Sequence, residues 1–131
     1  MNTSEINKIV ELGHKLSSIR YFHHKDLPTD IVCIELCFSD ICIYINIDEQ
    51  DDTLNVTPQG PIDNAIKEFD THFFDEAVNR SLRWFWLMEN NNGYRDALQF
   101  EFANNVSEPP VIIQLMAIGS RISIRRVLTD E

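Results

Sequence analysis

Two stretches in which apolar and polar residues alternate give the clearest structural signal in the chain. Residues 32–38 carry an apolar side chain at every second position, and residues 41–47 do the same after Ser39-Asp40. A two-residue turn at Ser39-Asp40 brings all of these apolar side chains to one face, whereas a slip of one residue would turn the whole set to the other face. The sequence therefore predicts a hairpin with four apolar pairs: Phe38 with Ile41, Leu36 with Ile43, Ile34 with Ile45, and Val32 with Ile47.

A second hairpin is predicted over residues 84–102, where two apolar runs flank Asn90-Asn91-Asn92-Gly93. The length of its loop decides which way the two tryptophans point. A three-residue loop pairs Trp86 with Leu98 and Trp84 with Phe100, which makes both tryptophans core residues. A loop of two or four residues instead aligns Phe85 and Leu87 with Leu98 and Phe100, and it places the tryptophans on the other face with Met88, Gln99 and Glu101. That face is either a second core covered by helices, which we favour, or a protein-binding surface.

The remaining elements follow from shorter patterns. Apolar residues at helical spacing predict a helix over residues 5–17, and a second, crossover helix over residues 62–78. Strands are predicted over residues 19–25, 53–57, 111–118 and 121–125, and the run 111–118 is apolar on both sides, as in an interior strand. The predicted fold is α+β: a single domain over residues 1–131, with a mainly antiparallel sheet of about seven to eight strands and helices packed on one face.

Length and composition agree with a single folded domain. The 131 residues include 44% hydrophobic and 24% charged residues, which is ordinary for a globular protein. The first residues show no basic segment followed by an apolar run, and no stretch reaches the ~18 apolar residues that a membrane span needs. We therefore expect a soluble, cytoplasmic protein that does not bind membranes.

The charge is distributed unevenly along the chain. Residues 1–79 contain fifteen Asp and Glu against five Lys and Arg, while residues 80–131 contain six of each, so the net charge of −10 arises entirely from the first part. Such a surface repels phosphate polyanions, which argues against nucleic-acid binding. It either serves solubility or attracts a basic protein partner. The residues predicted to bind a partner are Asp48, Glu49, Asp51, Asp52, Asp70, Asp75, Glu76, Trp84, Trp86 and Tyr94.

The three cysteines fit no zinc-binding spacing. The predicted register of the first hairpin places Cys37 opposite Cys42, so a cross-strand disulfide is geometrically possible, but a cytoplasmic protein is expected to keep them as thiols. The same register places Glu35 opposite Tyr44, in a polar patch that we expect to be solvated or to form an interaction face.

Candidate metal and catalytic sites are weak. His23 and His24 point to opposite faces of a strand, His72 has only Asp75 and Glu76 near it in the sequence, and the acidic turn at residues 48–52 lacks the glycine and glutamate of an EF-hand. The sequence contains no phosphate-binding loop, dinucleotide motif, nucleophile elbow or zinc-protease motif. We therefore expect no metal, no cofactor and no enzymatic activity.

One part of the chain resembles a small bacterial family of uncharacterised domains. The matching residues are Leu82, Trp84 and Trp86, then Asn91, Gly93-Tyr94, Asp96-Ala97-Leu98-Gln99 and Glu101-Phe102, then Ile113-Gln114-Leu115-Met116, all within residues 80–127. The family carries no assigned activity. Its size and acidity are similar to those of immunity proteins from bacterial polymorphic toxin systems, which is a likeness of type and not of motif.

The leading functional prediction is a non-enzymatic protein-binding domain, most concretely an immunity-type protein that neutralises a basic bacterial toxin domain. The alternative is a small acidic secretion chaperone, a class that is dimeric and ends in a helix packed on the sheet. An enzyme with an unrecognised site near His72 or His23 is the third possibility, and a homodimer is compatible with each.

Overall fold

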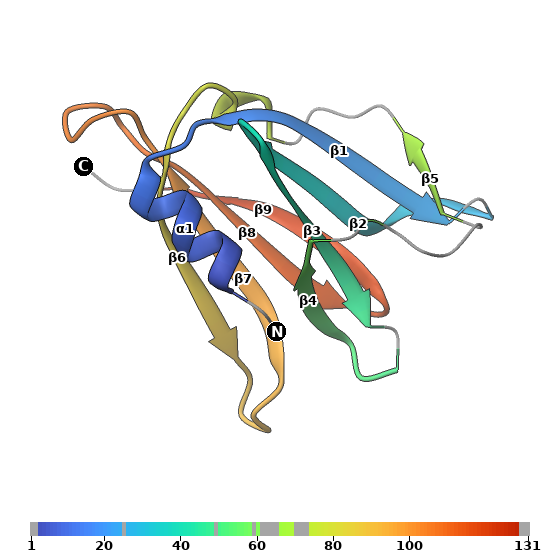
Figure 1. Cartoon of the computed structure of the whole chain (residues 1–131). Helices are drawn as coiled ribbons and strands as arrows, with labels where there is room; N and C mark the ends of the chain where they lie inside the picture. The colour runs from blue at the N-terminus through green and yellow to red at the C-terminus, as the bar shows by residue number, and fades with distance from the viewer. Residues whose placement is uncertain are drawn as a thin grey trace.

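The computed structural model describes residues 3–24, 26–48, 50–58, 60, 66–69 and 74–128. Within these ranges the chain forms one α-helix, nine strands and one 3-10 helix (Figure 1). In chain order they are α1 (Ser4–Leu12), β1 (Leu16–His24), β2 (Leu27–Phe38), β3 (Ile41–Asp48), β4 (Thr53–Thr57), β5 (Ile66–Phe69), η1 (Asp75–Ala77), β6 (Leu82–Glu89), β7 (Arg95–Phe102), β8 (Val111–Ile118) and β9 (Arg121–Val127).

The nine strands form two sheets, so the prediction of a single sheet is wrong. One sheet has the strand order β4-β3-β2-β1-β5, and the other has the order β6-β7-β8-β9. All the hydrogen-bonded neighbours are antiparallel, as predicted. Each sheet has one apolar face, and the two faces bury each other as two layers, visible in Figure 1. The second sheet thus covers the face that was predicted to be covered by helices, although α+β remains a fair coarse description.

The core lies between the two sheets. Phe38 of β2 and Phe102 of β7 stack across the interface with ring centroids 6.5 Å apart. Burying each large apolar side chain completely contributes about 1.5–3 kcal/mol, so this layer supplies most of the favourable free energy of folding. Its fully or nearly fully buried members come from both sheets and include Ile34, Leu36, Ile43, Ile45, Leu54, Leu98, Phe100, Ile113 and Leu115.

The predicted register of the β2–β3 hairpin is confirmed. Phe38 pairs with Ile41, Leu36 with Ile43 and Ile34 with Ile45. The pairing ends at Cys33 and Asn46, one step before Val32 and Ile47. Ser39 adopts a left-handed backbone conformation (φ 54°) in the two-residue turn. The apolar alternation therefore determines the register, because only this pairing buries all of these side chains together.

The N-terminal helix is shorter than the predicted residues 5–17, and the first strand begins earlier than residue 19. Gly13 ends α1 in a left-handed conformation (φ 67°), and the backbone N–H groups after the helix bond back to Ile9 and Val10. Ile6 and Ile9 are buried, and α1 contacts β3 of one sheet and β6 of the other. Among the described residues, no helix has the length and apolar content required to cross a membrane.

The crossover helix predicted over residues 62–78 is wrong. Ile66–Phe69 form strand β5, which pairs with β1 at the edge of the five-stranded sheet, and only Asp75–Ala77 form a turn of 3-10 helix. Residues 61–65 and 70–73 lie outside the described part of the chain. The apolar spacing here matches a helix by coincidence, and pairing with β1 outweighs that local preference.

Among the polar connections between the sheets, two use backbone groups and lie at different places. Near α1, Leu16 donates its backbone N–H to Arg80 (2.9 Å), Asn79 donates to Leu16 (2.8 Å), and Lys15 bridges Ser81. We call these contacts between residues 14–16 and 79–82 the seam. Elsewhere, the Asp52 carboxylate accepts hydrogen bonds from the backbone N–H groups of Gly119 (3.0 Å) and Ser120 (2.9 Å), so the β3–β4 turn is attached to the β8–β9 turn.

Candidate functional site

The register of the β6–β7 hairpin determines where the tryptophans lie. Phe85 pairs with Phe100 and Leu87 with Leu98, which is the alternative that turns Trp84 and Trp86 away from the core. The connecting loop has five residues, 90–94, and an extra residue in β7 at Asp96 shifts the pairing by one between Met88–Ala97 and Glu89–Arg95. Because of this extra residue, the strands pair as they would across a loop with an even number of residues.

Both tryptophans are exposed, so the expectation that they belong to the core is wrong. Trp84 is 58% exposed and Trp86 is 42% exposed. Their face points away from the five-stranded sheet, and no described element lies over it, because the five-stranded sheet and α1 both pack on the opposite, apolar face of the four-stranded sheet. A monomeric protein rarely exposes neighbouring large aromatic side chains without a binding role.

The tryptophans belong to a larger surface, which we call the Trp face. Paired residues of the four strands alternate between the two sides of the sheet, so those in register with Trp84 and Trp86 share their side. Ala97 and Ile112 are buried on this side beneath their larger neighbours. The Trp face has three rows across the sheet: Trp84, Glu101, Ile112 and Val127; Trp86, Gln99, Gln114 and Arg125; and Met88, Ala97, Met116 and Ser123.

Polar contacts fix the centre of the Trp face. The amide of Gln114 donates to Gln99 Oε1 (3.4 Å) and approaches Met88 Sδ (3.7 Å). Side chains held in place before binding lose less conformational entropy on association. Gln114 and Met116 were not among the predicted site residues. The signal for Gln114 is a polar residue within the otherwise apolar strand 111–118.

Tyr94, a predicted partner-binding residue, lies at the tip of the same hairpin and is 49% exposed. Its backbone N–H donates to Asn90 Oδ1 (3.2 Å), which also accepts from the Asn92 N–H (2.9 Å). The side chain of Asn90 thus organises the loop. The structure places Tyr94 at the end of the sheet that bears the Trp face.

The acidic turn between β3 and β4 is partly structural. Asp48 Oδ1 accepts the Gln50 N–H (3.0 Å), Asp51 Oδ1 accepts the Thr53 hydroxyl (2.6 Å), and Asp52 holds the β8–β9 turn. Asp51 is exposed, whereas Asp48 and Asp52 are half-buried. Among the predicted partner-binding residues of this turn, Asp52 therefore has a structural role, while Asp48 and Asp51 remain accessible to a partner.

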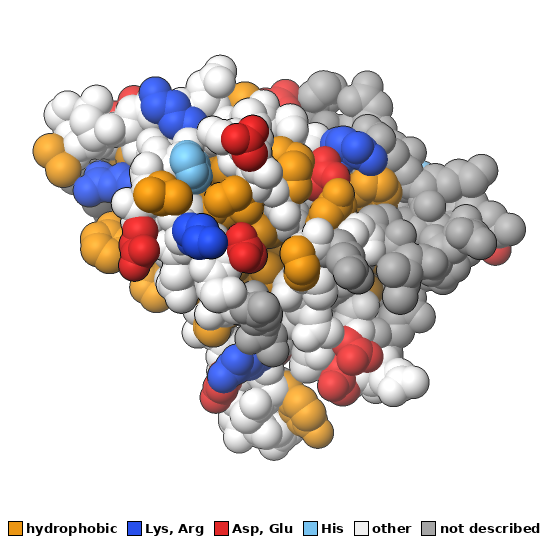
Figure 2. Space-filling model, in the orientation of Figure 1, with side chains coloured by type: hydrophobic (Ala, Val, Ile, Leu, Met, Phe, Trp, Pro, Cys, Tyr) orange, Lys and Arg blue, Asp and Glu red, His pale blue; other side chains and the backbone are white. Residues whose placement is uncertain are grey.

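The other predicted acidic residues lie apart from that turn. Asp75 and Glu76 are exposed, and Glu76 forms an ion pair with Arg126 near the end of β9. The β8–β9 turn is at the start of β9, so about 20 Å of strand separates the two acidic groups. Figure 2 shows acidic side chains near the β3–β4 turn and both signs mixed over the rest of that face. Glu49 and Asp70 lie outside the described residues.

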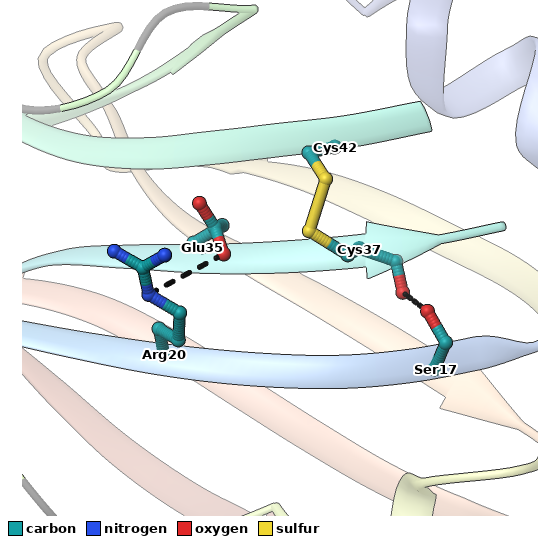
Figure 3. The surroundings of a disulfide bond; sticks show 5 residues. All are labelled: Ser17, Arg20, Glu35, Cys37 and Cys42. Atoms are coloured by element: carbon teal, nitrogen blue, oxygen red, sulfur yellow. Dashed lines mark hydrogen bonds and ion pairs between the residues drawn. A yellow bond between two sulfur atoms is a disulfide. The ribbon is translucent and has the colours of Figure 1, made fainter. Parts of the chain in front are cut away.

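The outer face of the five-stranded sheet carries a buried carboxylate, and the expectation that Glu35 is solvated is wrong. Glu35 is 5% exposed, and Arg20 Nε lies 3.6 Å from its Oε1 (Figure 3). A hydrogen bond to this carboxylate raises the pKa of Tyr44. The Arg20 guanidinium also lies 5.2 Å from the centre of the Phe22 ring. Glu35 is thus neutralised by its neighbours, as a buried charge requires.

Two of the three cysteines on this face differ from the expectation of thiols. Cys37 and Cys42 form a disulfide across the β2–β3 hairpin, with their Cα atoms 4.1 Å apart (Figure 3). Ser17 donates its hydroxyl to the Cys37 carbonyl (2.8 Å). Cys33 is a free, fully buried cysteine, and burial raises the pKa of its thiol to about 12. A thiol held protonated in this way is a poor nucleophile.

The two buried polar groups on this outer face are both engaged within the fold. Burial keeps the Cys33 thiol protonated, and the Glu35 carboxylate is paired with Arg20. Within the described ranges no three His, Cys, Asp or Glu side chains come close enough to hold a metal ion. His72, the histidine of the weak candidate metal site, lies outside those ranges.

Comparison with known proteins gives one match. The model of a family of unknown function (DUF6334) covers residues 1–130. No curated protein and no solved structure matches the chain. The match extends over the N-terminal part as well as over residues 80–127, where the motif resemblance was noticed.

Proposed function

The chain belongs to the family of unknown function (DUF6334), and we propose from its exposed Trp face that it is a non-enzymatic protein-binding domain. The observation that carries this proposal is the pair of neighbouring tryptophans, 58% and 42% exposed on a sheet face that no described element covers. Tryptophan is strongly enriched among the residues that dominate binding energy at protein interfaces. Methionine and the polar rim around the pair match the composition of such interfaces.

In its most concrete form, the proposed partner is a basic toxin domain and the chain is its immunity protein. The accessible carboxylates of Asp48 and Asp51 lie in the β3–β4 turn, which Asp52 attaches to the end of the four-stranded sheet. Negative charge beside an aromatic surface would speed the encounter with a basic partner, and the Trp face would then supply the affinity. Bound toxin would be blocked sterically, with no chemistry by this chain.

A secretion chaperone is the second candidate, and one observation weighs against it. Such chaperones have a helix packed on the face of their sheet. The apolar face of each sheet is already occupied by the other sheet. The immunity-type proposal is therefore favoured.

Affinity capture tests the proposed surface. The immobilised chain is exposed to an extract of the organism that encodes it, and bound proteins are quantified by mass spectrometry. Replacing Trp84 and Trp86 together by serine should reduce capture of the specific partner by at least about thirtyfold, which is the effect of losing one hot-spot residue worth about 2 kcal/mol. A matched control replaces Leu12 and Leu27, which are 61% and 53% exposed on other elements, by serine.

The comparison of the two variants distinguishes specific binding at the Trp face from non-specific binding by exposed apolar side chains. Equal capture by the tryptophan variant and the wild-type chain would refute the Trp face as the binding surface. If the captured partner is a basic toxin, adding the chain should abolish its activity at a fixed stoichiometry. Replacing Asp48 and Asp51 by asparagine should slow association and flatten its salt dependence, and a rate insensitive to salt would refute the steering role.

A further inference from the structure

β6 has a bulge at Arg83, where the pairing with β7 shifts by one residue between Leu82 and Trp84. Beyond this bulge, the outer edge of β6 lacks the features that normally prevent a strand from pairing with another chain. In the described part of the chain, β6 is hydrogen-bonded to β7 on one side, and only its beginning is covered on the other side, by the seam at Ser81 and Leu82. From residue 83 to residue 89 it contains no proline, glycine or lysine, and residues 84–88 are all apolar. In Figure 1 the β6–β7 hairpin extends beyond α1.

The other sheet edges are short or charged. β5 has four residues, and β4 has five and is followed by Pro58. β9 carries Arg121, Arg125 and Arg126. Short edge strands, proline and charge are the usual means of preventing edge-to-edge association, so β6 is the one described edge left open by this sequence.

The backbone of β6 is suited to accept a partner strand. Asn90 donates its N–H to Tyr94 within the hairpin, and the N–H and C=O groups of successive strand residues point to alternate sides. Counting back from Asn90, Met88, Trp86 and Trp84 direct their backbone groups to β7. The alternation changes at the bulge beside Arg83, because Leu82 donates its N–H to His14 on the outer side. Phe85 and Leu87 therefore present their backbone groups to the free edge.

The side chains of β6 are complementary to a second copy of the same strand. Two antiparallel copies related by a two-fold axis pair residues whose numbers have a constant sum. With the axis at Trp86, Arg83, which lies at the bulge, comes to the end of the pairing beside Glu89 of the other copy, so opposite charges meet at both ends. Within its own hairpin Glu89 also forms an ion pair with Arg95 (3.4 Å). Between them, Phe85 meets Leu87, and Trp84 meets Met88. Opposite charges and aromatic pairs directly across two strands each stabilise the pairing.

We propose that two copies of this chain associate antiparallel along β6, forming a continuous eight-stranded sheet with Trp86 at the two-fold axis. The net charge of −10 does not oppose this, because residues 80–131 contain six acidic and six basic residues. The dimer goes beyond the proposed function, because it joins two Trp faces into one surface with four tryptophans. It also covers Leu87, which is 36% exposed and is not among the residues of the core.

Sedimentation velocity over a wide concentration range tests the dimer with the full chain. The wild type should sediment as a dimer that dissociates on dilution. Leu87→Lys, which adds a charge to the free edge, should remain monomeric at concentrations where the wild type is dimeric. The matched control is Leu27→Lys, since Leu27 begins β2 in the other sheet and is 53% exposed. It should dimerise as the wild type does.

Charge reversal tests the register independently of Leu87. Arg83→Glu and Glu89→Arg alone should each weaken the dimer by about tenfold, because each places like charges opposite each other at both ends. The double variant Arg83→Glu/Glu89→Arg restores opposite charges and should recover wild-type dimerisation. Circular dichroism of each variant checks that the chain is folded.

Three results would overturn the proposal: a wild-type monomer at every concentration, a dimer unaffected by Leu87→Lys, or a double charge reversal that fails to recover dimerisation. The failure of this proposal can be told apart from failure of the proposed function. A monomer that still captures its partner through Trp84 and Trp86 rejects the β6 dimer and leaves the Trp face as the binding surface.

Discussion

At the scale of single residues, burial determines which side chains keep their ordinary chemistry. Glu35 and Cys33 are neighbours on the outer face of the same strand, and both are buried. The carboxylate is held by Arg20 and Tyr44, while the thiol avoids the cost of burying a charge by keeping its proton. Neither behaviour follows from residue type, because Glu35 alternates with apolar residues as a solvated strand residue does.

The thiol of Cys33 gives a pH-dependent prediction. Burial raises its pKa from 9.0 to about 12 in the folded protein, so between these values the folded chain retains a proton that the unfolded chain releases. The contribution to stability is complete below pH 9 and is lost as the pH rises towards 12, at about 1.4 kcal/mol per pH unit. Thiolate absorbance, with Cys33→Ala subtracted, should stay absent from the native protein near pH 10 and appear on unfolding. Native titration near pH 9 would contradict this.

At the scale of secondary-structure elements, prediction from sequence works where burial alone determines the register. The β2–β3 hairpin was predicted pair by pair, because any slip would expose Leu36 and Ile43. Prediction from sequence fails where pairing with a strand far away in the chain determines the structure. Ile66–Phe69 have the apolar spacing of a helix, but they form a strand that pairs with β1. The side on which Trp84 and Trp86 lie depends on the bulge at Asp96, for which the sequence offers no local signal. The sequence therefore predicts some residues of the candidate site, including Trp84 and Trp86, but it does not predict that the two tryptophans are exposed.

The same hairpin yields a prediction about its disulfide. Cys37 and Cys42 are only five positions apart, so linking them removes little freedom from the unfolded chain. Replacing both by alanine should lower the free energy of unfolding by at most about 2 kcal/mol. The register should persist, because the apolar face sets it. Denaturant unfolding and nuclear Overhauser contacts between Leu36 and Ile43 measure the two effects. A changed register would show that the disulfide, and not the apolar face, fixes the pairing.

At the scale of the whole molecule, two sheets with separate hydrogen-bond networks depend on a few cross-connections. Phe38 and Phe102 stack between the layers without specifying direction. The seam, the carboxylate of Asp52 and the ion pair of Arg121 with Asp30 (3.6 Å) supply directional contacts. The sequence does not predict the second sheet, because a strand has the same alternation of apolar residues whether a helix or another sheet covers its apolar face.

Removing the Asp52 carboxylate tests the second connection. Asp52→Ala should lower the free energy of unfolding by about 1–3 kcal/mol, since two backbone N–H groups lose a charged acceptor, and Asp52→Asn should lose less because it keeps one acceptor oxygen. Asp51→Ala is the matched control, because the Asp51 carboxylate accepts a hydrogen bond from Thr53 within its own turn. Denaturant unfolding measures all three. Equal losses for Asp52→Ala and Asp51→Ala would show that the attachment contributes nothing.

The seam also has a consequence for the order in which the protein forms during translation. Residues 14–16 leave the ribosome early, yet their partners at residues 79–82 follow more than sixty residues later. Until β7 and β8 have been synthesised, the apolar face of the five-stranded sheet has no layer that covers it. Strands β6–β9 are joined in sequence by short-range hairpins, which close rapidly once synthesised. Folding is therefore completed by the last third of the chain, and nascent chains that end before β8 present an uncovered apolar sheet to chaperones.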